Sequence, residues 1–239
     1  MKYFLRVLVW LFLSITVLLI GFYYTGNIVF RSVKVHPNGK RTIAQVLKDL
    51  EKSISHRIPN IEALTDGKPL TILIFKEERL LELWKKNGTI WEFVKSYPLT
   101  GSSGKLGPKL REGDLQIPEG EYDIEYLNPN SSYHLSMKLN YPNEFDRKMA
   151  EIEGRTRPGF DIFVHGSNRT LGCIPIGDEK IEEIFYIIAK NGYQHTKVLI
   201  APRDFRQGKS APIIEEIEWE NELYDMLNKR LREFQKIRL

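Results

Sequence analysis

The stretch from Phe160 to Gly177, FDIFVHGSNRTLGCIPIG, constrains the chain more than any other. Apolar and other side chains alternate up to His165, and a period of two predicts a β-strand that ends there. After a short polar loop and Cys173, apolar residues recur at helical spacing and predict a helix that is capped by Asp178. A histidine is thus expected at a strand end, and the only cysteine between a tight loop and a helix start.

This arrangement suits a thiolate nucleophile with an imidazole base. The imidazole of His165 can take the thiol proton of Cys173, because a thiol is mostly protonated at neutral pH. The backbone N–H groups of Leu171, Gly172 and Cys173 are candidates for an oxyanion hole, and a glycine at 172 lets a substrate carbonyl approach closely. The structural alternative is a small buried cysteine and a histidine that only forms hydrogen bonds.

The spacing H-G-x-x-x-T-x-G-C from His165 to Cys173, with Asp178 soon after, resembles the signature of the L,D-transpeptidase catalytic domain, the YkuD type, and its YafK-like branch. The resemblance covers roughly residues 70 to 205. Further matching segments are Y-P-L-T-G at 97–101, G-P-K-x-R-E-G-D at 107–114, P-E-G-x-Y at 118–122 and Y-P-N at 141–143.

The resemblance implies an α+β fold, mostly strand, with a sandwich-like core and flanking helices. It also implies that Cys173 attacks a peptidoglycan stem peptide, that His165 is the base, and that a backbone carbonyl near Gly166 orients the imidazole. The chain departs from common members of the family, because Leu171 stands where they have a second histidine and Pro175 where they have an arginine.

Three side chains are candidates for substrate binding. Arg169 lies inside the loop before the cysteine and can meet a carboxylate, and Thr170 belongs to the same loop. His134 can approach from a neighbouring strand, and a structural role for it is the alternative. Asp161 cannot orient His165, because four strand residues separate the two by about 13 Å.

The expected function is a peptidoglycan L,D-transpeptidase, which contributes to cell wall biogenesis and cell shape. It forms a Cys thioester with a stem peptide and transfers the stem to an amine acceptor. One alternative is a hydrolase on the same site, of the carboxypeptidase or endopeptidase type. Another is a catalytically silent wall-binding module. The expected partners are peptidoglycan stem peptides, with no cofactor, and the oligomeric state stays open.

Composition excludes several other classes of function. The 239 residues carry a net charge of only +4, and the basic residues are scattered, so a nucleic-acid partner is not expected. One cysteine excludes an internal disulfide and the usual cysteine-rich zinc sites. No metal site is expected, because the five histidines, at 36, 56, 134, 165 and 195, show no metal-ligand spacing.

The chain divides into four predicted parts. Residues 1–30 hold an apolar run, Val7 to Tyr24, that suits an uncleaved signal anchor, a single-pass transmembrane helix with the catalytic domain on the extracytoplasmic side. Residues 31–67 read as a polar linker with one helix at about 42–55. Residues 68–207 form the catalytic domain. Residues 208–239 contain an amphipathic helix, 213–239, which packs on its own domain or binds a partner.

Within the catalytic domain, period-two patterns and turn residues predict further elements. The segment 100–120 is rich in Gly, Pro and charge and reads as a long loop that lies over or beside the Cys173 site. Asn87-Gly88 predicts a hairpin turn. Strands are expected at 70–75, 80–84, 89–97, 122–127, 133–140 and 196–201, and a short helix at 143–153.

Overall fold

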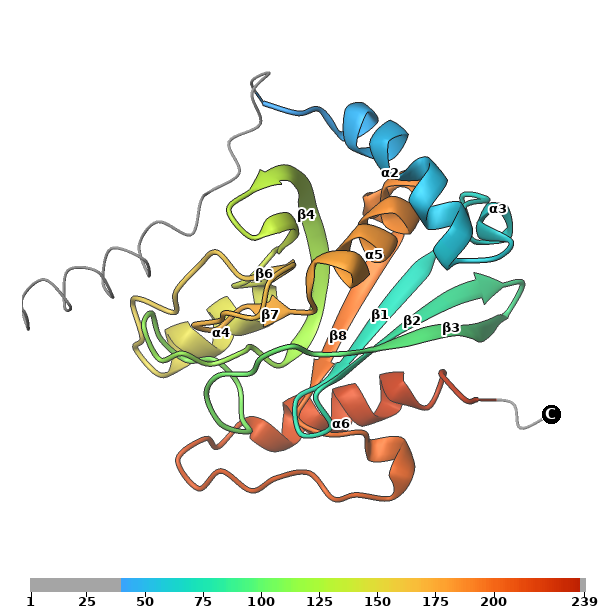
Figure 1. Cartoon of the computed structure of the whole chain (residues 1–239). Helices are drawn as coiled ribbons and strands as arrows, with labels where there is room; N and C mark the ends of the chain where they lie inside the picture. The colour runs from blue at the N-terminus through green and yellow to red at the C-terminus, as the bar shows by residue number, and fades with distance from the viewer. Residues whose placement is uncertain (1–39, 237–239) are drawn as a thin grey trace, which may run out of the picture. The chain divides into compact units, whose positions relative to one another are not determined.

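The computed structural model of the chain describes residues 40–236 (Figure 1). The predicted membrane segment, Val7 to Tyr24, lies outside these residues. Among the helices between residues 40 and 236, none is both long enough and apolar enough to cross a bilayer. The fold below is that of the compact unit that begins at Arg41.

Eight strands form one hydrogen-bonded sheet in the order β3-β2-β1-β8-β4-β5-β6-β7. The sequence-based expectation of a sheet with flanking helices is confirmed. The strands are not two separate sheets, because β4 pairs with β8 through its first residues and with β5 through the rest. The strands are β1 (Leu70–Phe75), β2 (Leu80–Asn87), β3 (Ile90–Pro98), β4 (Gly120–Ser131), β5 (His134–Leu139), β6 (Phe163–His165), β7 (Ile174–Pro175) and β8 (Thr196–Ala201).

The central strand β1 is buried along its whole length. Ile72 and Ile74 belong to one apolar core, whereas Leu73 and Phe75 belong to a second. Successive side chains of a strand point to opposite faces, so the unbroken apolar run of β1 faces a core on each side of the sheet. Helices must therefore cover both faces.

Helices α2 (Ile43–Arg57) and α5 (Asp178–Asn191) cover the first face (Figure 1). The helix predicted in the linker thus packs against the sheet domain, with Ile54 fully buried. Thr42 caps α2 through a capping box with Gln45, as the polar residue before an apolar periodic run predicts. An ion pair of 2.6 Å between Arg57 and Glu182 joins the two helices.

Helix α6 (Glu220–Leu231) covers the second face, where Leu227 and Phe234 are fully buried (Figure 1). The predicted start of this helix at Ile213 is wrong, because Ile213 is 85% exposed and the helix begins at Glu220. The backbone N–H of Ile214 donates to the carboxylate of Glu220, so the segment before the helix is hydrogen-bonded to the first helical residue.

Two local predictions near the cysteine also need correction. Strand β6 begins at Phe163 rather than Phe160, because Asp161 has a left-handed backbone (φ 57°) outside the extended region that strands require. Helix α5 is capped by Gly177, and Asp178 is its first residue.

The predicted hairpin turn is shifted by one residue, since Asn87 pairs with Ile90. The remaining helices are α3 (Ile61–Leu64), α4 (Glu144–Ile152), η1 (Tyr193–His195) and η2 (Phe205–Gln207).

Candidate active site

The pairing of β6 with β7 sets the relation between His165 and Cys173. The two strands run parallel, with Val164 opposite Ile174, and both of these side chains point into the core. His165 follows Val164, and Cys173 directly precedes β7, so continued alternation of side chains predicts that both lie on the opposite face. With strands about 4.8 Å apart and a rise of about 3.3 Å per residue, their Cα atoms are separated by about 8 Å. The pairing therefore brings the two predicted reactive residues close together and is consistent with side chains on the same face.

Packing and a hydrogen bond hold the imidazole of His165 in one orientation. Its ring is 1% exposed and stacks on Tyr133, with centroids 4.6 Å apart. The Nδ1 atom lies 2.5 Å from the backbone oxygen of Gly166. Because a carbonyl only accepts, Nδ1 carries the proton and Nε2 keeps its lone pair. Burial lowers the pKa of His165, although the bond to Gly166 opposes the shift, so the imidazole favours the neutral form.

Cys173 is half-buried, and its thiol donates to the backbone oxygen of Asp161 at 3.5 Å. Burial raises the pKa of the Cys173 thiol, which the backbone N–H of Phe163 partly offsets. The resting thiol is therefore protonated. A base must remove its proton for it to act as a nucleophile.

A compact turn presents the cysteine. The hydroxyl of Thr170 donates to the Cys173 carbonyl at 2.6 Å and accepts the N–H of Gly172 at 3.2 Å. Thr170, predicted to bind substrate, thus also shapes the turn. The Gly172 N–H, one of the three predicted oxyanion donors, has this hydroxyl as a partner. Leu171 is 79% exposed at the tip of the turn.

Gly172 is required by the backbone itself. Its φ of 120° lies in the left-handed region, and an added Cβ would stand 3.0 Å from the backbone oxygen of Gln116. The sequence suggested close approach of a substrate carbonyl as the reason for this glycine. The structure gives a second reason for this glycine, which is the close approach of the 100–120 loop to the backbone of Gly172.

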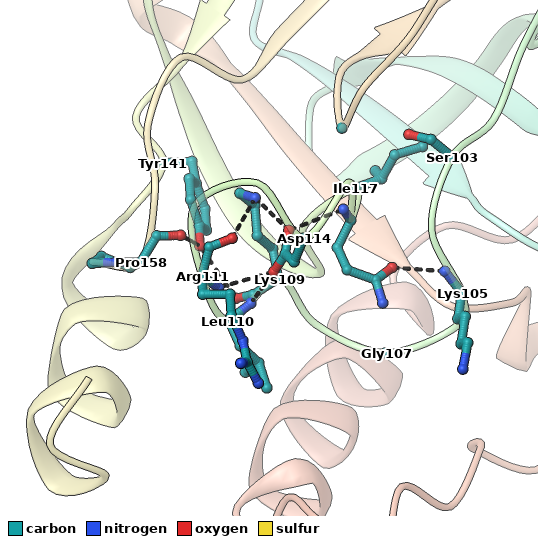
Figure 2. Close-up of polar contacts among 12 residues, drawn as sticks. Ser103, Lys105, Gly107, Lys109, Leu110, Arg111, Asp114, Ile117, Tyr141 and Pro158 are labelled. Carbon is teal, nitrogen blue, oxygen red and sulfur yellow. Dashed lines mark hydrogen bonds and ion pairs between the residues drawn. The ribbon is translucent and has the colours of Figure 1, made fainter. Parts of the chain in front are cut away.

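The long loop lies beside the cysteine turn, as the sequence predicted. The Thr100 hydroxyl donates to the Ser167 carbonyl at 2.7 Å, and Ser103 lies 3.5 Å from the hydroxyl of Thr170. Figure 2 shows the interior of this loop, where contacts converge on Asp114 from Lys109 and the neighbouring backbone. The 100–120 loop therefore lies along one side of the cysteine turn, and contacts within the loop stabilise its conformation.

Charged side chains around the site differ in their freedom. Arg169 is exposed, and no ion pair within residues 40–236 includes it. Lys138 binds Asp161 at 3.2 Å. His134, a candidate for substrate binding, bonds through Nε2 to Glu182 on α5 at 2.7 Å. Of the predicted substrate contacts, Arg169 is thus the one whose charge is most available.

The described part of the chain holds no group of three His, Cys, Asp or Glu side chains that could bind a metal ion.

Sequence reasoning missed two contributors to the site. Gln116 reaches the turn only through the loop fold. Asp178 was read as a cap, yet its carboxylate accepts the Ser167 N–H at 2.7 Å. The short spacing from the histidine to this aspartate was the available signal.

Comparison with known proteins now identifies the family. The model of the L,D-transpeptidase catalytic domain, YkuD, matches residues 69–200. This chain belongs to the L,D-transpeptidase catalytic domain family. The matched residues run from the buried strand β1 to β8 and include His165, Cys173 and the whole 100–120 loop.

This L,D-transpeptidase domain is similar to curated proteins and to solved structures. "Putative L,D-transpeptidase YafK" of Escherichia coli (strain K12) is 37% identical over 124 residues, which are 51% of this chain and 48% of YafK. The match thus spans about half the length of the curated relative. The helical cell shape determining protein Pgp2 from Campylobacter jejuni is 22% identical over 58% of this chain and 49% of Pgp2, with a TM-score of 0.47. Bdellovibrio bacteriovorus Bd1075 is 22% identical over 69% of this chain and 54% of Bd1075, with a TM-score of 0.43.

Proposed function

We propose that the protein is a peptidoglycan L,D-transpeptidase in which Cys173 is the nucleophile and His165 the general base. The observation that supports the proposal is the parallel pairing that brings the His165 and Cys173 segments together, with a hydrogen bond from Nδ1 of His165 to the Gly166 carbonyl that leaves Nε2 free of a proton in the neutral ring. A protonated thiol beside a neutral imidazole is the pair that general-base activation needs.

The reaction proceeds in two balanced halves. Nε2 of His165 takes the thiol proton while the sulfur of Cys173 attacks the carbonyl carbon of the third stem residue. The C–N bond breaks, His165 gives the proton to the leaving amine, and a thioester remains. An acceptor amine then attacks the thioester, its proton passes to His165, and the C–S bond breaks. The Cys173 thiol is restored, and no oxidant or reductant is needed.

Backbone donors and one cation support the reacting carbonyl and the stem peptide. The backbone N–H groups of Leu171, Gly172 and Cys173 remain the candidate donors for the negative charge that develops on the carbonyl oxygen, although that of Gly172 also donates to the Thr170 hydroxyl. Arg169 is the candidate partner for a stem carboxylate, because it is exposed and lies in the same turn. A cavity of about 380 Å³ beside the turn is lined in part by Thr100 and Asn168, but neither Cys173 nor His165 lines it.

The substrate implies the location of the domain. Peptidoglycan lies outside the cytoplasmic membrane, so the catalytic domain acts there, attached through the apolar run of Val7 to Tyr24. The anchor is part of the proposal.

Acylation of Cys173 tests the proposed chemistry. Wild-type protein and Cys173→Ala are incubated with a carbapenem and with defined tetrapeptide muropeptides, and adducts and products are read by mass spectrometry. We expect a single adduct on Cys173 and turnover in the wild type, and neither in Cys173→Ala with an unchanged melting temperature. Wild-type turnover by Cys173→Ala contradicts the nucleophile. Hydrolysed tripeptide alone, in abundant acceptor amine, favours the hydrolase instead.

A further inference from the structure

One peptide unit joins His165 to a carboxylate on α5. The carbonyl of the Gly166–Ser167 peptide accepts from Nδ1 of His165 at 2.5 Å, and its N–H donates to Oδ1 of Asp178 at 2.7 Å. We propose that Asp178 is a positioning residue, which holds the imidazole of His165 through this peptide. The inference rests on the proposed function, because it concerns the base of that reaction.

The planarity of the peptide carries the coupling. The C=O and N–H of one amide unit are fixed relative to each other, so a partner for the N–H also sets the direction of the carbonyl. A chain of hydrogen bonds through an amide also strengthens each member, since every bond polarises the next. Asp178 therefore fixes both the place and the strength of the acceptor that His165 uses.

The backbone of Ser167 is in an unfavourable conformation. Ser167 has a φ of 63°, which is unfavourable for a side chain other than glycine and persists only where surrounding contacts impose it. A flip of the 166–167 peptide would change this φ and relieve the strain. The flip would also turn the N–H toward His165. Nδ1 would then become the acceptor, Nε2 would carry the proton, and the imidazole would no longer be a base.

Asp178 is placed to prevent that flip. Its Oδ1 atom accepts the N–H in the unflipped state, while Thr100 holds the Ser167 carbonyl at 2.7 Å. The same oxygen packs on Gly166, where an added Cβ would lie only 2.6 Å from it. The carboxylate thus fits against this glycine closely enough to fix the peptide.

A helix-capping role makes a different prediction, and Glu179 provides the matched control. Asp178 and Glu179 are both exposed acidic residues in the first turn of α5, where negative charge stabilises a helix. Within residues 40–236, the Glu179 side chain forms no hydrogen bond to the cysteine turn. Loss of either charge costs the helix a similar amount, but only Asp178 reaches the peptide beside His165.

The experiment compares Asp178→Ala, Asp178→Asn and Glu179→Ala in the full chain. The readouts are the rate of Cys173 acylation by a carbapenem, the melting temperature, and the His165 tautomer by ¹⁵N NMR, assigned with His165→Gln. We expect Asp178→Ala to lose the Nδ1–H tautomer and to be acylated about 10²-fold more slowly, because a correctly placed base contributes at least that much. Asp178→Asn keeps an oxygen acceptor and should retain the tautomer and most of the rate. Glu179→Ala should match the wild type in both.

The proposal is overturned if Asp178→Ala keeps the wild-type tautomer and acylation rate, or differs from Glu179→Ala only in melting temperature. If Asp178→Ala does not fold, Asp178→Ser replaces it, because the shorter hydroxyl does not reach the Ser167 N–H. Failure of the proposed function is distinguishable: wild-type Cys173 would then not be acylated, whereas the tautomer comparison would still report whether Asp178 controls His165.

Discussion

At the level of single side chains, burial decides the charge states of the two reactive groups. His165 is almost completely enclosed and Cys173 half so, and in each case desolvation disfavours the charged form. Both shifts favour a neutral imidazole and a neutral thiol over a preformed ion pair. In the proposed reaction, His165 must then be unprotonated before substrate binds.

The pH dependence of acylation follows from this state. Because burial lowers the pKa of His165, the neutral base persists below the ordinary value of about 6.5 and is lost only at lower pH. We expect the acid limb of the acylation rate constant for Cys173 to have its midpoint below about pH 6.5. The measurement is a pH series of carbapenem acylation by stopped flow. His195→Gln, which removes an exposed histidine on η1, should leave the midpoint unchanged, and a midpoint above about 6.5 would contradict the neutral base.

Some residues of the site were predictable and others were not, for a physical reason. His165 and Cys173 follow from one continuous motif on a strand and a turn, so local sequence is enough. Asp178 also lies close in sequence, but its proposed role depends on the orientation of the 166–167 peptide and on the left-handed backbone of Ser167. Conformations of that kind are imposed by tertiary contacts, and no spacing rule reports them.

At the level of elements, the 100–120 loop is a braced wall. Asp114 accepts the backbone N–H groups of Leu110 and Arg111, each at 2.9 Å, and forms an ion pair with Lys109 (Figure 2). At the base of the loop, the buried Lys76 ammonium binds two loop carbonyls and the Glu119 carboxylate, at 2.7 to 2.9 Å. A long segment without regular structure is thereby held in a fixed shape beside the cysteine turn.

A rigid wall matters most for the second half of the reaction, in which an amine must compete with water. We expect Asp114→Ala to lower the ratio of cross-linked to hydrolysed product about tenfold while acylation of Cys173 changes less than about twofold, because positioning supplies the advantage of the amine. The reason is that the substitution leaves the Leu110 and Arg111 N–H groups without their acceptor. Muropeptide products with excess acceptor provide the measurement.

The matched control is Glu112→Ala in the same loop. Its ion pair with Arg157 is largely exposed and contributes little to stability, so the product ratio should stay at the wild-type value. An unchanged ratio in Asp114→Ala, or an equal fall in both variants, would show that the loop does not hold the acceptor.

Prediction succeeded for elements whose pattern is dictated by the core and failed where distant contacts decide. The apolar run of β1 and the capped helix α2 were both recognisable, because burial and local hydrogen bonds fix them. The start of α6 was not. The apolar residues of the segment from Ile213 follow helical spacing. The Trp219 indole, however, donates a hydrogen bond to Glu153, which is distant in the sequence. A tertiary hydrogen bond of this kind can override the helical periodicity of the sequence before Glu220.

At the level of the whole molecule, the family-matched segment does not contain all of the fold that surrounds it. Residues 69–200 include α5 and the whole sheet except Ala201, the last residue of β8, but neither α2 nor α6. Yet α2 contributes Ile54 to the first core, and α6 contributes Leu227 to the second. The sheet needs a cover on both faces, so we propose that residues 41–236 fold as one unit and that α6 is an integral layer, not a docking helix.

This view of α6 predicts a loss of stability without a loss of chemistry. Leu227 is fully buried on the face of the sheet opposite α5, and a leucine-to-alanine change in a core costs about 2–5 kcal/mol. For a domain of this size, that cost lowers the melting temperature by about 5–15 °C. Leu227→Ala should show this shift in calorimetry and keep the wild-type acylation rate of Cys173 at low temperature. Asp225→Ala, an exposed change on the same helix, should do neither. If α6 instead served a partner, Leu227→Ala would leave the melting temperature of the monomer near that of Asp225→Ala and change only its association with other chains.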